Sequence, residues 1–342
     1  MKTKLFSMVI LLSLLMLLSF SLLLGGDDGR RGTAGASELL IPVGAKSAGM
    51  SGAVTSSVTG AEAIYWNPAG ASQIDGSEIS FSHLSYLADI GVNYFALASR
   101  FGSTGTFGIS LKTLSFGDIP ITTTDLPEGT GGTFSPSYIT FGLTYSNRFT
   151  DRIFGGATLK YISEKIIRTQ ATGFAVDLGI QYKSTTGLKL GVVLKNLGPS
   201  MRFDGPDLEN FTALPEQDPG SRTRALQLTA AEFELPSTLE IGLGYDILVG
   251  DQHKFELGAT FQNTNFGSDE YRFGAEYGWN NMFFVRAGIT RTQNQSEYIF
   301  GPTFGVGVNI SVGEKSSIAV DYSYRKTDFF SGNQWLDVKL AL

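Results

Sequence analysis

The stretch EYRFGAEYG, Glu270 to Gly278, alternates between two kinds of residue. One set is aromatic or apolar and the other is charged or glycine: Tyr271, Phe273, Ala275 and Tyr277 oppose Arg272, Gly274, Glu276 and Gly278. Side chains of a β-strand point alternately to the two faces of a sheet. The period of two therefore predicts a strand with one apolar face and one polar face.

The same alternation recurs from about Ile79 to Leu342, and each run ends in a turn rich in Gly, Asn, Asp or Ser. The pattern predicts roughly fourteen strands, with ends accurate to about 2–4 residues. They lie near 77–84, 90–99, 105–114, 138–147, 152–162, 172–182, 187–195, 237–247, 253–262, 270–278, 282–291, 301–311, 316–325 and 334–342.

The length of these runs favours a membrane barrel. Strands of about 9–11 residues match a tilted bilayer crossing, and a sheet in lipid must close on itself. Soluble strands are nearer 5–6 residues. The 25 Phe, 13 Tyr and 42 Gly suit an apolar exterior around a crowded, polar lumen. We predict an all-β, transmembrane antiparallel β-barrel; a soluble β-sandwich, which also alternates, is the alternative.

The connections differ in length on the two sides of the predicted barrel. Those after the even-numbered strands are short, whereas 115–137 and 196–236 are long. Outer-membrane barrels have short periplasmic turns and longer extracellular loops. The pattern predicts a barrel over 77–342 in the outer membrane, with both termini periplasmic.

The N-terminus has the form of a targeting segment. Two lysines precede an apolar run from Leu5 to Leu24, which is a signal peptide or a membrane anchor. Ala34-Gly35-Ala36 supplies a small-residue cleavage site, so we predict a signal peptide over 1–36 and a mature start at Ser37. Cleavage nearer Gly25 is the alternative.

The segment 37–76 precedes the first strand and lacks its alternation. It is rich in Gly, Ala and Ser, and a helical turn at Ala61 to Tyr65 would end before Pro68. We predict that it forms a hatch inside the barrel. A periplasmic tail is the alternative.

Composition excludes several classes of function. The chain has no cysteine, which excludes a lipoprotein anchor, disulfides and thiolate metal sites. Its net charge is −6 and no basic run is longer than Arg30-Arg31, so nucleic acid binding is not expected.

Enzymatic chemistry has little support in the sequence. There are two histidines, and no Gly-x-Ser-x-Gly elbow occurs. His83 lies beside Ser82 but is expected to be a polar rim residue. We predict no catalytic residues, no metal site and no cofactor.

The alternation places charges of both signs in the lumen. They either pair across strands and fix the register, or form a solute-selecting constriction. The residues are Lys160, Asp177, Lys189, Glu240, Glu256, Arg272, Glu276, Arg286 and Asp321.

The connection 196–236 is the predicted functional surface, because it is far longer than an ordinary hairpin loop. Its apolar residues should pack against a partner or a ligand. The candidates are Phe203, Leu208, Phe211, Leu214 and Phe233.

The stretch GAKSAGMSGAVTSSVTGAEAIYWNPAG, Gly44 to Gly70, resembles the N-terminal signature of the PorV/PorQ family, a branch of the FadL-like outer-membrane barrels. The resemblance implies fourteen strands and an N-terminal hatch. It departs from the family pattern at Lys46, where Arg is common, and at Thr59-Gly60, which replaces an acidic pair. The hatch motif residues are Gly49, Met50, Gly52, Asn67, Pro68 and Ala69.

The resemblance implies two possible functions. PorV-like members shuttle exported proteins in type IX secretion and pass them to a surface complex that contains a peptidase. FadL-like members transport hydrophobic compounds across the outer membrane. The resemblance favours the shuttle, with outer-membrane lipids, secreted cargo proteins and a surface peptidase complex as partners; hydrophobic small molecules belong to the alternative. A purely structural barrel or adhesin would not need a hatch.

Overall fold

The computed structural model describes residues 32–212, 224–292, 298–313 and 316–342. Most of the predicted signal peptide, residues 1–31, lies outside the described residues. Among the residues that are described, no helix is long and apolar enough to cross a membrane.

Fourteen long strands in the described residues form one barrel. They are β1 (Ser77–Ser85), β2 (Gly91–Arg100), β3 (Thr106–Ser115), β6 (Ser137–Arg148), β7 (Ile153–Ile166), β8 (Thr169–Lys183), β9 (Leu188–Leu197), β13 (Thr238–Val249), β14 (His253–Thr264), β15 (Glu270–Trp279), β16 (Phe283–Thr292), β17 (Phe300–Val312), β18 (Ser316–Thr327) and β19 (Asn333–Ala341).

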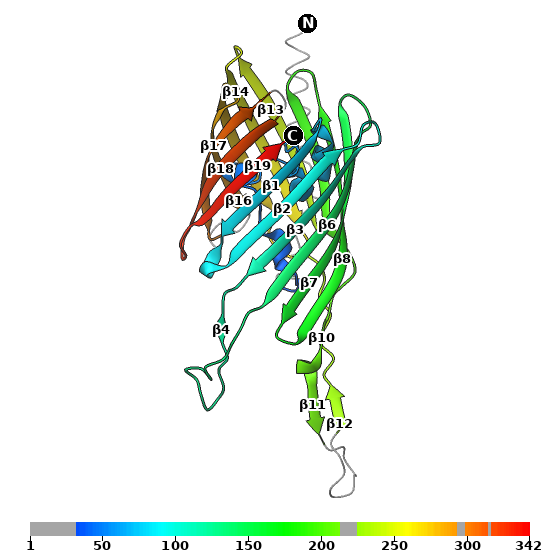
Figure 1. Cartoon of the computed structure of the whole chain (residues 1–342), viewed down its shortest axis with the longest axis vertical. Helices are drawn as coiled ribbons and strands as arrows, with labels where there is room; N and C mark the ends of the chain where they lie inside the picture. The colour runs from blue at the N-terminus through cyan, green and yellow to red at the C-terminus, as the bar shows by residue number, and fades with distance from the viewer. Residues whose placement is uncertain (1–31, 213–223, 293–297, 314–315) are drawn as a thin grey trace, which may run out of the picture.

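The barrel closes between its first and last strands (Figure 1). Each strand pairs antiparallel with a neighbour on both sides, and β1 pairs with β19 from Glu78 opposite Ala341 to Ser85 opposite Gln334. Closure leaves no open sheet edge in lipid, where an unpaired backbone group is costly. The prediction of a fourteen-stranded antiparallel barrel is confirmed.

The alternation sorts the side chains between the two faces of the wall. On the outer face, Leu257 is 47% exposed and Phe273 is 50% exposed, as a lipid-facing surface requires. On the inner face, Glu256 and Glu276 are buried. Because the sheet is a closed barrel with an apolar exterior, the alternative prediction of a soluble β-sandwich was wrong.

One connection is much shorter than the sequence indicated. The predicted strands left 163–171 as a loop, but β7 and β8 continue to a tight turn at Ile167 and Arg168. Ile167 has a φ of 54°, a conformation that favours glycine or asparagine. The usual turn signal is therefore missing from this hairpin.

The long connections between strands all leave one end of the barrel, which we call the long-loop end. The opposite, short-turn end carries the tight turns and the C-terminus (Figure 1). Two small sheets project from the long-loop end. The short arm, 116–136, contains β4 (Ile119–Pro120) and β5 (Thr133–Phe134), and the long arm, 198–237, contains β10 (Phe203–Asp204), η5 (Pro206–Leu208), β11 (Glu209–Thr212) and β12 (Arg224–Gln227).

Residues 37–76, which we call the hatch, lie within the barrel as short helical turns. They are η2 (Ser37–Leu40), α2 (Ala45–Gly49), α3 (Ala63–Trp66) and η3 (Pro68–Gln73). α2 contacts β16 to β19, whereas η3 contacts β3 and β6 to β8 on another part of the wall. The hatch core, with Met50, Ile64 and Trp66, packs against Tyr94 and Ala96 of β2.

Glycines on the inner face allow the hatch to lie directly on the wall. At nine of them an added Cβ would come within 2.0–2.8 Å of a hatch atom. These glycines belong to eight different strands: Gly108, Gly156, Gly179, Gly191, Gly242, Gly244, Gly258, Gly274 and Gly288. Larger residues would leave no room for the hatch, so the two parts fit in a single arrangement.

We predict that Gly258→Ala destabilises the barrel by about 1–3 kcal/mol, because overpacking forces the surroundings to move. Its Cβ would lie 2.0 Å from the backbone oxygen of Ala53. The free energy of unfolding in urea, measured in lipid vesicles, tests this. Gly91→Ala is the matched control, since its Cβ would meet nothing closer than 3.8 Å. Equal stability of the two variants would contradict the close contact.

Candidate functional site

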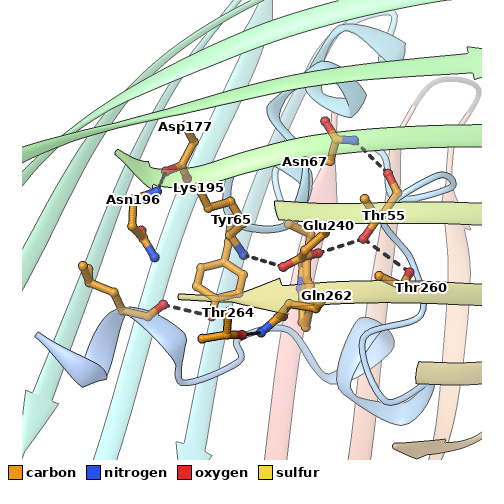
Figure 2. Close-up of polar contacts among 12 residues, drawn as sticks. Thr55, Tyr65, Asn67, Asp177, Lys195, Asn196, Glu240, Thr260, Gln262 and Thr264 are labelled. Carbon is orange, nitrogen blue, oxygen red and sulfur yellow. Dashed lines mark hydrogen bonds and ion pairs between the residues drawn. The ribbon is translucent and has the colours of Figure 1, made fainter. Parts of the chain in front are cut away.

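Asn67 links the hatch to two strands of the wall. Figure 2 shows its bond to Thr55 within the hatch. Its side-chain amide donates to the backbone oxygens of Thr55 at 2.8 Å, Ile180 at 3.3 Å and Val192 at 3.5 Å. Its Oδ1 accepts from the N–H of Ala69 at 3.2 Å and caps η3. Asn67 is fully buried, so these bonds satisfy an amide that water cannot reach.

The other half of the hatch motif meets a different part of the wall. Met50 is fully buried, and its backbone lies against Gly274 and Gly288. The backbone oxygen of Gly49 accepts from Thr303 Oγ1 at 3.0 Å. Gly52 has a φ of 75° and an added Cβ would strike the Trp66 ring, so this turn needs glycine.

Two aromatic residues that we did not select from the sequence organise the hatch. Tyr65 donates its hydroxyl to the backbone oxygens of Leu39 at 3.2 Å and Ile41 at 2.8 Å. Trp66 Nε1 donates to Val43 O at 2.9 Å. These bonds hold the first hatch residues over α3. The pair precedes the Asn-Pro-Ala turn directly, which was the available signal.

The lumen charges that the alternation predicted all take part in ion pairs. Lys160 meets Asp177 at 2.6 Å, and Lys195 meets Glu240 at 3.5 Å. Arg286 lies 2.5 Å from both Glu276 and Asp321; Lys189 pairs with Asp246 and Glu256, and Arg272 with Glu270. Apart from Arg272 with Glu270, which lies within β15, these pairs join different strands. Cross-strand pairing fixes register, so these contacts favour the structural network over a solute-selecting constriction.

The hatch contributes a charged residue, Lys46, next to this network. The Glu276 carboxylate, with Glu256 adding to it, raises the pKa of Lys46. Lys46 therefore stays protonated beside wall carboxylates, although arginine is common at this position in the family that the sequence resembles. Burial raises the pKa of Glu38, at the start of the hatch.

A cavity of about 390 Å³ lies between the hatch and the long-loop end. Tyr65 and Trp66 form part of its lining on the hatch side. Its walls are formed by β9 and by the strands from β13 to β19. The connections before β15 and β17 line its outer part. Figure 2 shows Lys195, Glu240 and Gln262 around Tyr65 in this region. A hollow of this size is in the range of about 300–1,000 Å³ seen for small-molecule sites.

The long arm is anchored where it leaves the barrel. Phe203 and Phe233 pack together, with ring centroids 5.7 Å apart, beside the buried Met201. β10 continues the sheet by pairing with β8. The guanidinium of Arg168 lies 2.6 Å from Asp207, and bonds from the Arg168 backbone and side chain lower the pKa of that carboxyl.

The predicted loop residues therefore fall into different positions. Phe203 and Phe233 come together at the base of the long arm, where they contact the rest of the chain. Leu208 belongs to η5 and Phe211 to β11, further out. Leu214 lies outside the described residues.

The residues around the predicted cleavage site also contact the base of the long arm. Gly35 N donates to Glu234 O at 3.1 Å, and Ala36 is buried beside Leu39. The predicted cleavage before Ser37 and the alternative nearer Gly25 both stay predictions.

His83 and Ser82 do not form a catalytic pair in the structure. Ser82 is buried on the inner face of β1, whereas His83 is exposed on the outer face and bonds to Asn93 at 2.8 Å. The two side chains are thus on opposite sides of the wall. No group of three or more metal-ligating side chains occurs among the described residues.

Comparison with known proteins now gives the family. A family model described as "Type IX secretion system protein PorV" matches residues 26–217, more than half of the chain. The chain belongs to the PorV family. This family and the FadL-like channels are not enzymatic, as the sequence indicated. No curated protein matches the chain.

Solved structures share the fold of this PorV-family chain. A structure titled "CymD monoaromatic hydrocarbon channel" is 12% identical, with a TM-score of 0.52, over 88% of this chain and 97% of that one. The Pseudomonas putida toluene transporter TodX is 13% identical, with a TM-score of 0.53, over 87% and 97%. A Pseudomonas aeruginosa FadL homologue is 14% identical, with a TM-score of 0.47, over 88% and 98%. The first two likenesses establish a FadL-like fold, and the family places this barrel in the outer membrane.

We predict that Asn67→Ala destabilises the barrel by about 2–3 kcal/mol, because it removes the buried hydrogen bonds of the amide and the cap of η3. Asn93→Ala, which removes one exposed bond to His83, is the control and should cost under about 0.5 kcal/mol. Urea unfolding in lipid vesicles measures both. A loss for Asn67→Ala no larger than for the control would contradict its linking role.

Proposed function

We propose that this PorV-family barrel binds exported proteins at its long-loop end and passes them to a surface complex of the type IX secretion system. The observation that carries the proposal is a barrel whose lumen is filled by its hatch and whose two arms project from one end (Figure 1). A partner would therefore meet the arms rather than pass through the lumen.

The filled lumen supports a role other than that of an open pore. Backbone and side-chain atoms of the hatch lie against glycines on eight strands. Buried ion pairs such as Arg286 with Glu276 and Asp321 brace the wall beside it. Displacing the hatch would break its contacts with all of these strands together.

The arms offer apolar surface for a protein partner. Leu126 of the short arm is 53% exposed, and Leu226 and Leu228 of the long arm are 45% and 64% exposed. Phe329, in the nearby β18–β19 connection, is 82% exposed. Apolar groups that are exposed on projecting arms offer an interaction surface. The small sheets β4–β5 and β11–β12 also have edges that can pair with an incoming strand.

We also propose the orientation of the barrel. The short-turn end, with the C-terminus, faces the periplasm, and the arms face the cell exterior, as the loop asymmetry of outer-membrane barrels suggests. The first described residues instead contact the base of the long arm, so this orientation does not carry the prediction that the N-terminus is periplasmic. Leu342 N bonds to Ser77 O at 2.8 Å, so the C-terminus and the first strand share one end. Exported proteins would then be met at the cell surface.

Uptake of hydrophobic compounds is the alternative, and the named relatives that transport aromatic hydrocarbons share only the fold. An apolar hollow of about 650 Å³ on the wall around β2, β3, β6 and β7 is the feature that favours it. However, neighbouring strands are paired around the whole described wall, and the cavity above the hatch is lined by several charged residues. These features support uptake less well than cargo binding.

The orientation can be tested by labelling, because the chain has no cysteine. Leu126→Cys lies in the short arm, and Asp251→Cys lies in the short turn after β13. We expect a membrane-impermeant maleimide to label the first variant on intact cells and the second only after the outer membrane is permeabilised. The opposite pattern would invert the proposed orientation.

Cargo binding can be tested with the long arm. We expect Leu226→Ser/Leu228→Ser to reduce co-purifying exported proteins about five-fold or more, because the buried apolar contact is lost. Quantitative mass spectrometry after purification from native envelopes measures this. Leu248→Ser/Val249→Ser, equally exposed near the short-turn end, is the control. If the arm variant and the control retain the same partners, the proposal fails.

A further inference from the structure

Two buried carboxyl groups meet where the hatch begins. Glu38 of η2 and Glu164 of β7 are both buried, and their side chains form a hydrogen bond with each other. Oε1 of Glu164 is buried and meets no N–H or hydroxyl donor among the described residues. Because an ionised carboxylate can only accept hydrogen bonds, a bond between two carboxyls requires a proton on one of them.

Burial favours keeping this proton in place. Two carboxylates that share a site repel each other, and removal from water disfavours the charged form further. The pKa of Glu38 is raised for this second reason. A pair of carboxyls that holds one proton carries a single negative charge instead of two.

One buried cation faces this single negative charge. Lys112 of β3 is buried, and its ammonium group donates to the backbone oxygens of Glu38 at 2.7 Å and Ile41 at 2.6 Å. Its positive charge also favours the ionised form of Glu38. One negative charge on the carboxyl pair is therefore balanced, whereas a second would be in excess.

The other titratable groups nearby do not change this balance. Tyr138 of β6 faces both carboxyls. Lys160 and Lys195 lie close enough to act on Lys112, but each is already paired with a carboxylate of the wall. These pairs leave Lys112 as the cation that faces Glu38.

The carboxyl pair holds a part of the hatch that the wall glycines do not hold. The hatch atoms that lie against those glycines belong to residues 50–69, whereas η2 precedes them. Leu39 of η2 packs beside Met201 at the base of the long arm. Besides the carboxyl pair, bonds from Lys112 and Tyr65 reach this segment. The start of the hatch can therefore move while the rest stays seated.

We propose that Glu38 and Glu164 share one proton and form a latch, which holds η2 on the wall and opens when the proton is lost. In the open latch both carboxyls meet water and are ionised, so opening releases one proton. Exposed carboxyls are ionised above about pH 5, and buried glutamates keep a proton up to about pH 8–9. Between these limits the equilibrium constant for opening should rise up to ten-fold per pH unit. This inference does not depend on the proposed shuttle, since it concerns the hatch and not what the arms bind.

Hydrogen exchange of the protein purified from outer membranes in a non-ionic detergent tests the latch. The readout is the exchange rate of backbone N–H groups in residues 37–43, corrected for the intrinsic rate at each pH. We expect the corrected rate to rise about ten-fold or more between about pH 6 and about pH 8, because opening releases a proton. EDTA is present throughout, so that no divalent cation takes the place of the proton.

Glu164→Gln supplies a fixed N–H donor in place of the shared proton. The latch should then stay closed, and the corrected rate should no longer depend on pH. Glu38→Gln should have the same effect from the hatch side. Glu78→Gln is the matched control, since Glu78 is a buried carboxylate of β1 that accepts from Ala61 N at 2.8 Å, and it should keep the pH dependence of the parent.

Infrared spectroscopy detects the proton itself. At about pH 6 the parent and Glu78→Gln should show the C=O stretch of a protonated carboxyl, and Glu164→Gln should lose that band. Absence of the band, a corrected rate that does not change with pH in the parent, or the same pH dependence in Glu164→Gln would each overturn the inference. If neither glutamine variant folds, the band and the pH dependence of the parent decide the question.

Discussion

The close contact between the hatch backbone and the inner wall is the constraint on which the rest of the structure depends. It requires glycine where the two meet, as at Gly258 beneath Ala53 and Gly179 beside Asn67. It also fixes where water and ligands can go. With the hatch in this position, the described cavity lies on one side only, toward the long loops. The arms and that cavity are the surfaces through which the barrel can act.

Polar contacts make this arrangement specific. Thr55 of the hatch donates to Glu240 at 2.8 Å while its backbone oxygen accepts from Asn67 and Gln181, so one residue joins several strands. The wall charges around it are paired. Because an isolated charge is costly in such a place, Arg325 stands out among the described residues, with its Nε and Nη2 atoms buried without a partner.

The sequence predicted the barrel well, because the inside–outside alternation is a local property of each strand. It also indicated the hatch motif, although the function of Asn67 in joining β8 and β9 depends on contacts between distant residues. The hairpin at Ile167 was missed, since its turn lacks the usual residues. Phe203 and Phe233 were selected for their apolar character, but only the folded chain places them against each other at the base of the long arm. The cavity and the unpaired Arg325 arise from the convergence of many strands, which no local pattern reveals.

The central claim is that the barrel works by its arms while the hatch stays in place. A cryo-electron microscopy structure of the protein isolated from its native envelope with bound partners would test this most directly. We expect polypeptide density against the β4–β5 and β11–β12 sheets, with the hatch seated on the glycines of the wall. Bare arms together with a displaced hatch and a continuous passage through the barrel would contradict it.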